Sequence, residues 1–178
     1  MGKTALALSM AHSIAKHFEH QHRTSESTAK MPSVGFFSLE MSSEQLAARV
    51  LSSDSGISSS DLRKGTFDQD QFGHVVESSK NIARLPMFID DTPALTIASM
   101  RARARRLKRM HNLGLLVVDY LQLMRGSSKS GDNRVQEVSE ITMGLKAIAK
   151  EPIQKYQCES QTRRTTPVTT PITLASFV

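Results

Sequence analysis

The triplet Gly2-Lys3-Thr4 opens a segment rich in Ala and Leu and has the residue types that bind phosphate. It matches the last three positions of the phosphate-binding loop pattern G-x-x-x-x-G-K-[ST]. Backbone N–H groups at a helix N-terminus attract phosphate, Lys3 could reach the β- and γ-phosphates of a nucleotide, and Thr4 could coordinate Mg²⁺. Because the strand and the first glycine of the pattern do not precede the triplet, a chance match is the alternative interpretation.

Two carboxylates each follow a short apolar run: Asp119 comes after 115–118, and Glu40 comes after 34–39. The carboxyl ends of parallel strands form the edge at which α/β folds bind ligands. In phosphate-loop NTPases an Asp at such a position holds Mg²⁺, and a Glu could orient and deprotonate the water that attacks the γ-phosphate. The alternatives are a polar turn residue at Asp119 and a helix-entry acid at Glu40, before Ser42.

The elements that would position these residues alternate between helix-like and strand-like segments, which predicts an α/β fold. Apolar residues at helical spacing predict helices at 4–18, 44–51, 60–64, 68–83, 96–111 and 133–151. Short apolar runs predict strands at 34–39, 87–90 and 115–118. Residues 152–178 hold three of the six prolines and have no sustained period, so we expect a disordered tail there.

Composition limits the class of protein. A chain of 178 residues, 39% hydrophobic and 22% charged, predicts one domain with a hydrophobic core. The single cysteine, Cys158, excludes a disulfide-stapled secreted scaffold. No apolar run reaches the roughly 18 to 20 residues needed to cross a bilayer. We therefore expect a cytoplasmic protein without a membrane partner.

The net charge of +6 comes from one segment, Arg101–Arg109, which holds six basic residues and no acid. The apolar residues of this predicted helix would face the sheet, which places the arginines on its outer face. A solvated face or a subunit contact is therefore favoured over direct contact with DNA. Four histidines, at positions 12, 17, 20 and 22, fit no common metal-ligand spacing, so a solvated helix end is favoured for them.

The candidate phosphate, metal and carboxylate residues occur in an order that a known family shares. The segments GKTALAL, FFSLEMS, LPMFIDDTPALTI and LLVVDYLQLM resemble the RecA-type motor domain of bacterial replicative DNA helicases, the DnaB family. The similarity runs through residues 2–151, and SLEM with DYLQLM separates this family from most other RecA-like ATPases. The resemblance implies an incomplete RecA-like P-loop NTPase core over residues 1–151, with a mostly parallel sheet flanked by helices and a start inside the phosphate loop.

The resemblance also implies ATP and Mg²⁺ as cofactors and assigns roles at the site. Gly2, Lys3, Thr4 and Asp119 would bind the nucleotide, with Thr4 and Asp119 at the metal. Glu40 would be the catalytic glutamate.

Partners follow from the same resemblance. The loop 125–133 matches a segment expected to face the channel of a homohexameric ring. Arg125, Lys129 and Arg134 could contact phosphates of single-stranded DNA there, and a flexible solvated loop is the alternative. Primase and a helicase loader would be further partners, and Gln122 has no derived role.

The expected function is ATP-dependent DNA strand unwinding at the replication fork. The family's N-terminal domain and linker, the first part of the phosphate loop and the basic finger for the neighbouring ATP site have no match here, so the resemblance describes a fragment, expected to be defective by itself. Two alternatives stay open: a non-catalytic remnant that binds helicase subunits or nucleic acid, and another RecA-like ATPase.

Overall fold

The protein is described by a computed structural model over residues 2–25, 29–125, 134–151 and 173–177. In these residues the strands form one sheet, in the order β2-β1-β3-β4, with all neighbours parallel. The strands are β1 (Ser33–Ser38), β2 (Met87–Asp90), β3 (Leu113–Asp119) and β4 (Thr173–Phe177). The helices are α1 (Lys3–Thr24), α2 (Ser43–Ser55), α3 (Ser59–Lys64), α4 (Gln69–Arg84), α5 (Ile97–His111), η1 (Leu121–Leu123) and α6 (Arg134–Lys150). The predicted class, a mostly parallel sheet flanked by helices, is confirmed.

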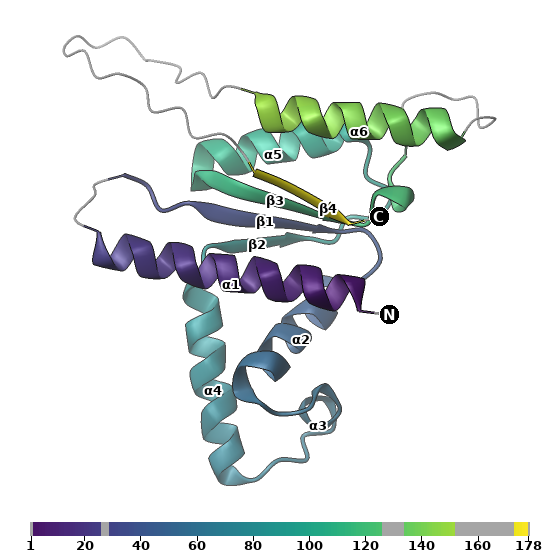
Figure 1. The fold of residues 1–178 in the computed structure, drawn as a ribbon. Helices are drawn as coiled ribbons and strands as arrows, with labels where there is room; N and C mark the ends of the chain where they lie inside the picture. The colour runs from purple at the N-terminus through teal and green to yellow at the C-terminus, as the bar shows by residue number, and fades with distance from the viewer. Residues whose placement is uncertain (1, 26–28, 126–133, 152–172, 178) are drawn as a thin grey trace.

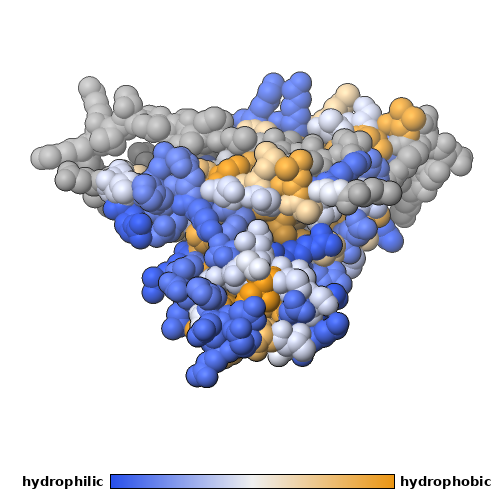
Figure 2. Space-filling model, turned by 60° about the horizontal axis from the view of Figure 1, so that its bottom comes forward, coloured by the Kyte–Doolittle hydropathy of each residue, from blue (hydrophilic) through white to orange (hydrophobic). Residues whose placement is uncertain are grey.

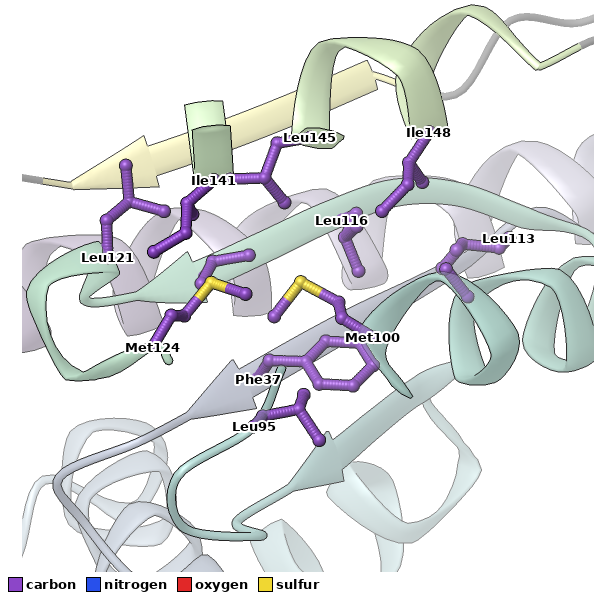
Figure 3. Packing of buried hydrophobic residues seen from close by; sticks show 12 residues of the cluster. Phe37, Leu95, Met100, Leu113, Leu116, Leu121, Met124, Ile141, Leu145 and Ile148 are labelled. Carbon is purple, nitrogen blue, oxygen red and sulfur yellow. The ribbon is translucent and has the colours of Figure 1, made fainter. Parts of the chain in front are cut away.

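Side chains of β1 and β3 alternate between two cores, as the two-residue period of a strand requires. Phe37 and Leu116 point to the face covered by α5 and α6, where they pack with Met100, Ile141 and Leu145 (Figure 3). The neighbouring residues Val34, Phe36, Leu115 and Val117 belong to the core under α1 and α2 on the opposite face. The central strands are therefore buried on both sides, which explains their nearly unbroken apolar sequences.

Four helix starts carry side-chain caps. The side chains of Ser42, Ser58, Asp68 and Thr96 each accept a hydrogen bond from the backbone N–H three residues further on. Such caps satisfy N–H groups that have no partner inside the helix. The starts of α2, α3, α4 and α5 are thus specified by local sequence, before tertiary packing.

A lobe made of α2, α3 and α4 extends from one face of the sheet (Figure 1). Gly56 and Gly65 end α2 and α3 in left-handed conformations, with φ of 73° and 68°, which lets the chain reverse twice within the lobe. In Figure 2, which brings the lobe forward, the surface of the lobe is mostly hydrophilic around a smaller hydrophobic area. No helix in the described part of the chain combines the length and hydrophobicity that a bilayer span requires.

Strand β4 differs from the disordered tail expected for 152–178. Thr173–Phe177 pairs with β3 in parallel, from Leu115↔Thr173 to Asp119↔Phe177. This stretch lacks proline and contains β-branched and aromatic residues, and it covers backbone groups of β3 that would otherwise form a sheet edge. The rest of the expected tail, residues 152–172 and 178, lies outside the described residues.

Candidate functional site

The carboxyl ends of β1 and β3 lie side by side. Ser38 is in register with Asp119, and the Leu39 N–H donates a hydrogen bond to the Asp119 carbonyl at 2.9 Å. Glu40 comes next after Leu39, so the fold brings both candidate carboxylate residues to one edge of the sheet. This is the edge at which open α/β sheets bind ligands.

The Asp119 side chain is buried at this edge. It is 1% exposed, and its Oδ2 atom has no hydrogen-bond partner among the described residues. A buried carboxylate oxygen without a partner is destabilising unless a cation or a donor compensates it. The position therefore has the chemistry of a cation ligand.

The N-terminus of α1 lies on the side of the sheet toward which the strands point (Figure 1). Gly2 is the N-cap residue, makes no side-chain cap, and accepts a hydrogen bond from the Leu6 N–H at 2.8 Å. The first turn of α1 contains no acidic residue, and a Cβ at Gly2 would meet no described atom within 4 Å. Lys3 is exposed and Thr4 is half-buried. A helix start of this kind favours an anion.

Glu40 is exposed in the turn between β1 and α2. Ser38 organises this turn: its Oγ donates to the Met41 carbonyl at 2.7 Å and accepts from the Met41 N–H at 3.1 Å. Ser38 had no predicted role, although its place two residues before Glu40 in the motif SLEM is the signal that could have indicated one.

The three candidate DNA-binding residues are only partly described. Arg125 is exposed, and its N–H donates to the Leu95 carbonyl at 3.3 Å beside the start of α5. Lys129 lies outside the described residues, and Arg134 is the first residue of α6. The geometry thus places Arg125 and the start of α6, and it leaves the DNA contact a prediction.

Comparison with known proteins settles the family. A family model described as "DnaB-like helicase C terminal domain" matches residues 1–167. The chain belongs to this family.

Relatives of this DnaB-like domain include replicative DNA helicases. The chain is 55% identical over 151 residues to the DnaB replicative helicase of Rickettsia bellii, and 41% identical over 151 residues to the replicative helicase DnaC of Bacillus subtilis. These alignments cover 85% of this chain and 30% or 31% of the relatives, so the chain spans about a third of their length.

Two solved structures share the fold of this DnaB-like domain. A solved structure described as an ATPase domain superposes with a TM-score of 0.71 at 22% identity, over 83% of this chain and 48% of that one. A DnaB-like replicative helicase, described together with its interactions with primase, superposes with a TM-score of 0.70 at 23% identity, over 83% of this chain and 33% of that one.

The basic segment of the DnaB-like domain exposes Arg105, Arg106 and Arg109, as its sequence predicts, but four of its basic residues also have partners within the chain. Arg101 and Arg105 both contact the Glu151 carboxylate at the end of α6, with N···O distances of 2.5 and 2.7 Å. The hydrogen bond from Arg105 holds the pKa of Glu151 below its usual value; burial opposes this, and Arg101 adds to the lowering. These arginines thus join α5 to α6 within the chain.

Two further basic residues of α5 are also used internally. Arg103 Nη1 lies 2.5 Å from Asp90 Oδ2 at the end of β2. Lys108 is buried and donates from Nζ to the Leu113 carbonyl at 2.6 Å, and burial lowers the pKa of Lys108. Asp90 and Glu151 lie 13 to 50 residues from their arginine partners in the sequence, so the helical pattern alone did not indicate these contacts.

For His12, one of the four clustered histidines, the predicted solvated position is wrong. His12 lies on the buried face of α1, whereas His17, His20 and His22 are at least partly exposed. Burial lowers the pKa of His12, and the nearby positive charge of Lys16 lowers it further. No group of three or more His, Cys, Asp or Glu side chains among the described residues could hold a metal ion.

Proposed function

We propose that this chain forms part of the ATPase domain of a replicative DNA helicase, and that the helicase couples ATP hydrolysis to DNA strand unwinding. The observation that carries the proposal is the buried Asp119 carboxylate, which has an unpartnered oxygen at the same sheet edge as Glu40 and the start of α1. Family membership supports it, since the curated relatives are named as replicative DNA helicases. We propose residues 1–151 as the extent of this domain.

The start of α1 would bind the phosphates of ATP. Gly2 and Lys3 would supply backbone N–H groups and an ammonium group, and these neutralise phosphate charge. Thr4 and Asp119 would hold Mg²⁺, because a hydroxyl and an uncompensated carboxylate oxygen are the ligand types that this hard cation prefers. When bound, Mg²⁺ would neutralise charge on the β- and γ-phosphate oxygens.

Glu40 would act as the general base. Its carboxylate is exposed, so water can reach it, and the turn that carries it is fixed by the two Ser38–Met41 hydrogen bonds. A carboxylate in this position orients a water molecule and accepts its proton as the water attacks the γ-phosphate.

Nucleic acid and protein partners belong to the proposal as well. Arg125, Lys129 and Arg134 would contact phosphates of single-stranded DNA, and such contacts do not depend on base sequence. We propose a homohexameric ring as the assembly, with primase and a helicase loader as partners. A solved relative described with its primase interactions supports the primase assignment.

Calorimetric titration of the chain with ATP in the presence of Mg²⁺ tests the proposal. Lys3→Ala should weaken binding at least about tenfold, which corresponds to loss of one charge-assisted contact of about 1.4 kcal/mol. The control is Lys64→Ala, on exposed α3 in the lobe, and its affinity should stay within about twofold of the unsubstituted chain. Absence of ATP binding, or binding that survives Lys3→Ala, would refute the proposed nucleotide site.

A further inference from the structure

Two consecutive acids at the end of β2, Asp90 and Asp91, bind different elements. Asp90 contacts Arg103 of α5. Asp91 accepts a hydrogen bond at Oδ2 from the backbone N–H of Ser43, the first residue of α2, at 2.7 Å. The second contact joins residues 48 positions apart in the chain. The end of β2 is therefore linked to a helix on each face of the sheet.

The contact with Ser43 bears on the turn that carries Glu40. This turn leaves β1 after Ser38 and enters α2 at Ser43. At its first end, Ser38 Oγ is hydrogen-bonded to both the N–H and the carbonyl of Met41. At its second end, Asp91 holds the N–H of Ser43. The backbone on both sides of Glu40 thus has a fixed partner outside the helix ladder.

Asp91 is itself held in place by its neighbours. The Asp90 side chain accepts hydrogen bonds from the Thr92 N–H at 3.1 Å and from Arg103 Nη1, and Arg103 also donates to Thr92 Oγ1 at 2.8 Å. These contacts fix the backbone on both sides of Asp91. A carboxylate at the start of α2 also interacts favourably with the positive end of the helix dipole. The hydrogen bond from the Ser43 N–H lowers the pKa of Asp91, which favours the ionised side chain.

We propose that Asp91 is a positioning residue for Glu40: it holds the start of α2 and thereby sets where the Glu40 carboxylate stands. This inference rests on the proposed function, in which Glu40 is the general base. A misplacement of about 1 Å in a reacting group can reduce rate about 100-fold. The effect of Asp91 would pass through the backbone of residues 39–43, not through a contact with the nucleotide.

The alternative is that Asp91 only caps α2 and stabilises the fold. Asp68 is the matched control, since it is an exposed carboxylate that accepts a hydrogen bond at 2.8 Å from a backbone N–H in the first turn of α4, in the lobe. Asp91→Ala and Asp68→Ala each remove one helix-capping carboxylate. Asp91→Asn keeps an acceptor oxygen for the Ser43 N–H and serves as the conservative variant.

The experiment compares these variants in the 178-residue chain by two measurements. Amide hydrogen exchange of residues 39–43 should be at least about fivefold faster in Asp91→Ala and close to the unsubstituted rate in Asp91→Asn and Asp68→Ala. Single-turnover ATP hydrolysis, slow in this partial domain, should fall by a further factor of about ten or more in Asp91→Ala with the half-saturating ATP concentration unchanged, and Asp91→Asn should keep most of the unsubstituted rate.

Equal exchange at residues 39–43 in Asp91→Ala and Asp68→Ala would overturn the inference. So would an unchanged hydrolysis rate in an Asp91→Ala protein whose turn exchanges faster. If the unsubstituted chain binds no ATP, the proposed nucleotide site fails, whereas the exchange measurement still decides whether Asp91 holds this turn.

Discussion

Two aspartates end apolar strands of the same sheet, and their surroundings differ. Asp90, at the end of β2, is half-buried and accepts hydrogen bonds from Arg103 and from the Thr92 N–H. Asp119, at the end of β3, is 1% exposed, and its Oδ2 has no partner in the described part of the chain. The more deeply buried carboxylate is the less compensated one.

The difference separates a carboxylate whose charge is compensated from one whose Oδ2 is not compensated by any described residue. Burial raises the pKa of Asp90, but the hydrogen bonds from Thr92 and Arg103 outweigh it, and the pKa lies below its ordinary value. Folding therefore favours the charged form of Asp90. Asp119 has no such compensation at Oδ2, so its burial costs stability, and a bound cation would offset that cost. Strand-ending acids look alike in sequence, and only their partners distinguish them.

The largest change in stability should come from disturbing the contact between α6 and α5, the helix whose Arg103 neutralises Asp90. A Cβ added at Gly144 would lie 2.3 Å from Ile97 Cγ1, whereas one at Gly73 of α4 would meet nothing within 4 Å. Gly144→Ala should lower the free energy of unfolding by about 1–3 kcal/mol. Gly73→Ala should raise it by about 0.5–1 kcal/mol, because alanine is the better helix former. Urea denaturation of both variants checks the signs, and a stabilising Gly144→Ala would show that this contact is looser than described.

The same isosteric change, Asp to Asn, should alter the stability of the fold in opposite directions at Asp90 and Asp119. Asp90→Asn loses the charge-assisted contact with a partly exposed Arg103 and should destabilise the fold by about 1 kcal/mol. Asp119→Asn removes a buried charge whose Oδ2 has no described partner, and the stability should stay equal or rise by up to about 1 kcal/mol. Thermal unfolding without nucleotide or Mg²⁺ measures both. A strongly destabilising Asp119→Asn would show that Asp119 is structural, like Asp90.

Glu151, like Asp90, is a carboxylate whose charge is compensated by arginines of α5. Its pKa is lowered in the fold, so its contribution to stability is present above the unfolded value, about 4.5, and is lost as the pH falls through the lower folded value. Since both arginine partners are substantially exposed, Glu151→Gln should cost only about 0.5 kcal/mol at neutral pH. The variant should also lose less stability than the unsubstituted protein on acidification below about pH 4.5, and a parallel pair of stability curves would contradict the assignment.

The smallest effect concerns His12, which is buried without a described partner at Nε2. Burial lowers the pKa of His12. As the pH falls, His12 therefore takes up a proton near 6.5 in the unfolded chain, while the same imidazole stays neutral in the folded chain. Stability contributed by neutral His12 is therefore lost as the pH falls below about 6.5. His12→Gln should flatten the stability curve between about pH 7.5 and 5.5, and exposed His17→Gln should not. Identical slopes in both variants would remove His12 from this account.

Local sequence rules predicted much of the fold. Strand β2 has the predicted bounds, 87–90, and α5 begins one residue after its predicted start because Thr96 is the N-cap. Helix α1 runs to Thr24 instead of Phe18, since the polar residues beyond Phe18 include no helix breaker. Motif position also indicated which carboxylates share the sheet edge.

The sequence did not indicate which residues distant along the chain contact one another. Nothing in the sequence pattern indicates that Asp91 binds a backbone N–H 48 residues away, or that Glu151 neutralises two arginines of α5. These contacts arise only when the sheet and both helix layers have assembled. The same holds for β4, whose pairing with β3 depends on an open neighbouring position in the sheet.

The most direct test of the central claim is the Mg²⁺ dependence of ATP binding, measured by calorimetry with Mg²⁺ and with a chelator. In the unsubstituted chain and in Asp90→Asn, removal of Mg²⁺ should weaken ATP binding about tenfold or more. In Asp119→Asn, the affinity should be low and should change by less than about twofold between the two conditions. A folded Asp119→Asn protein that keeps the full Mg²⁺ dependence would contradict the claim that Asp119 serves the metal–nucleotide site.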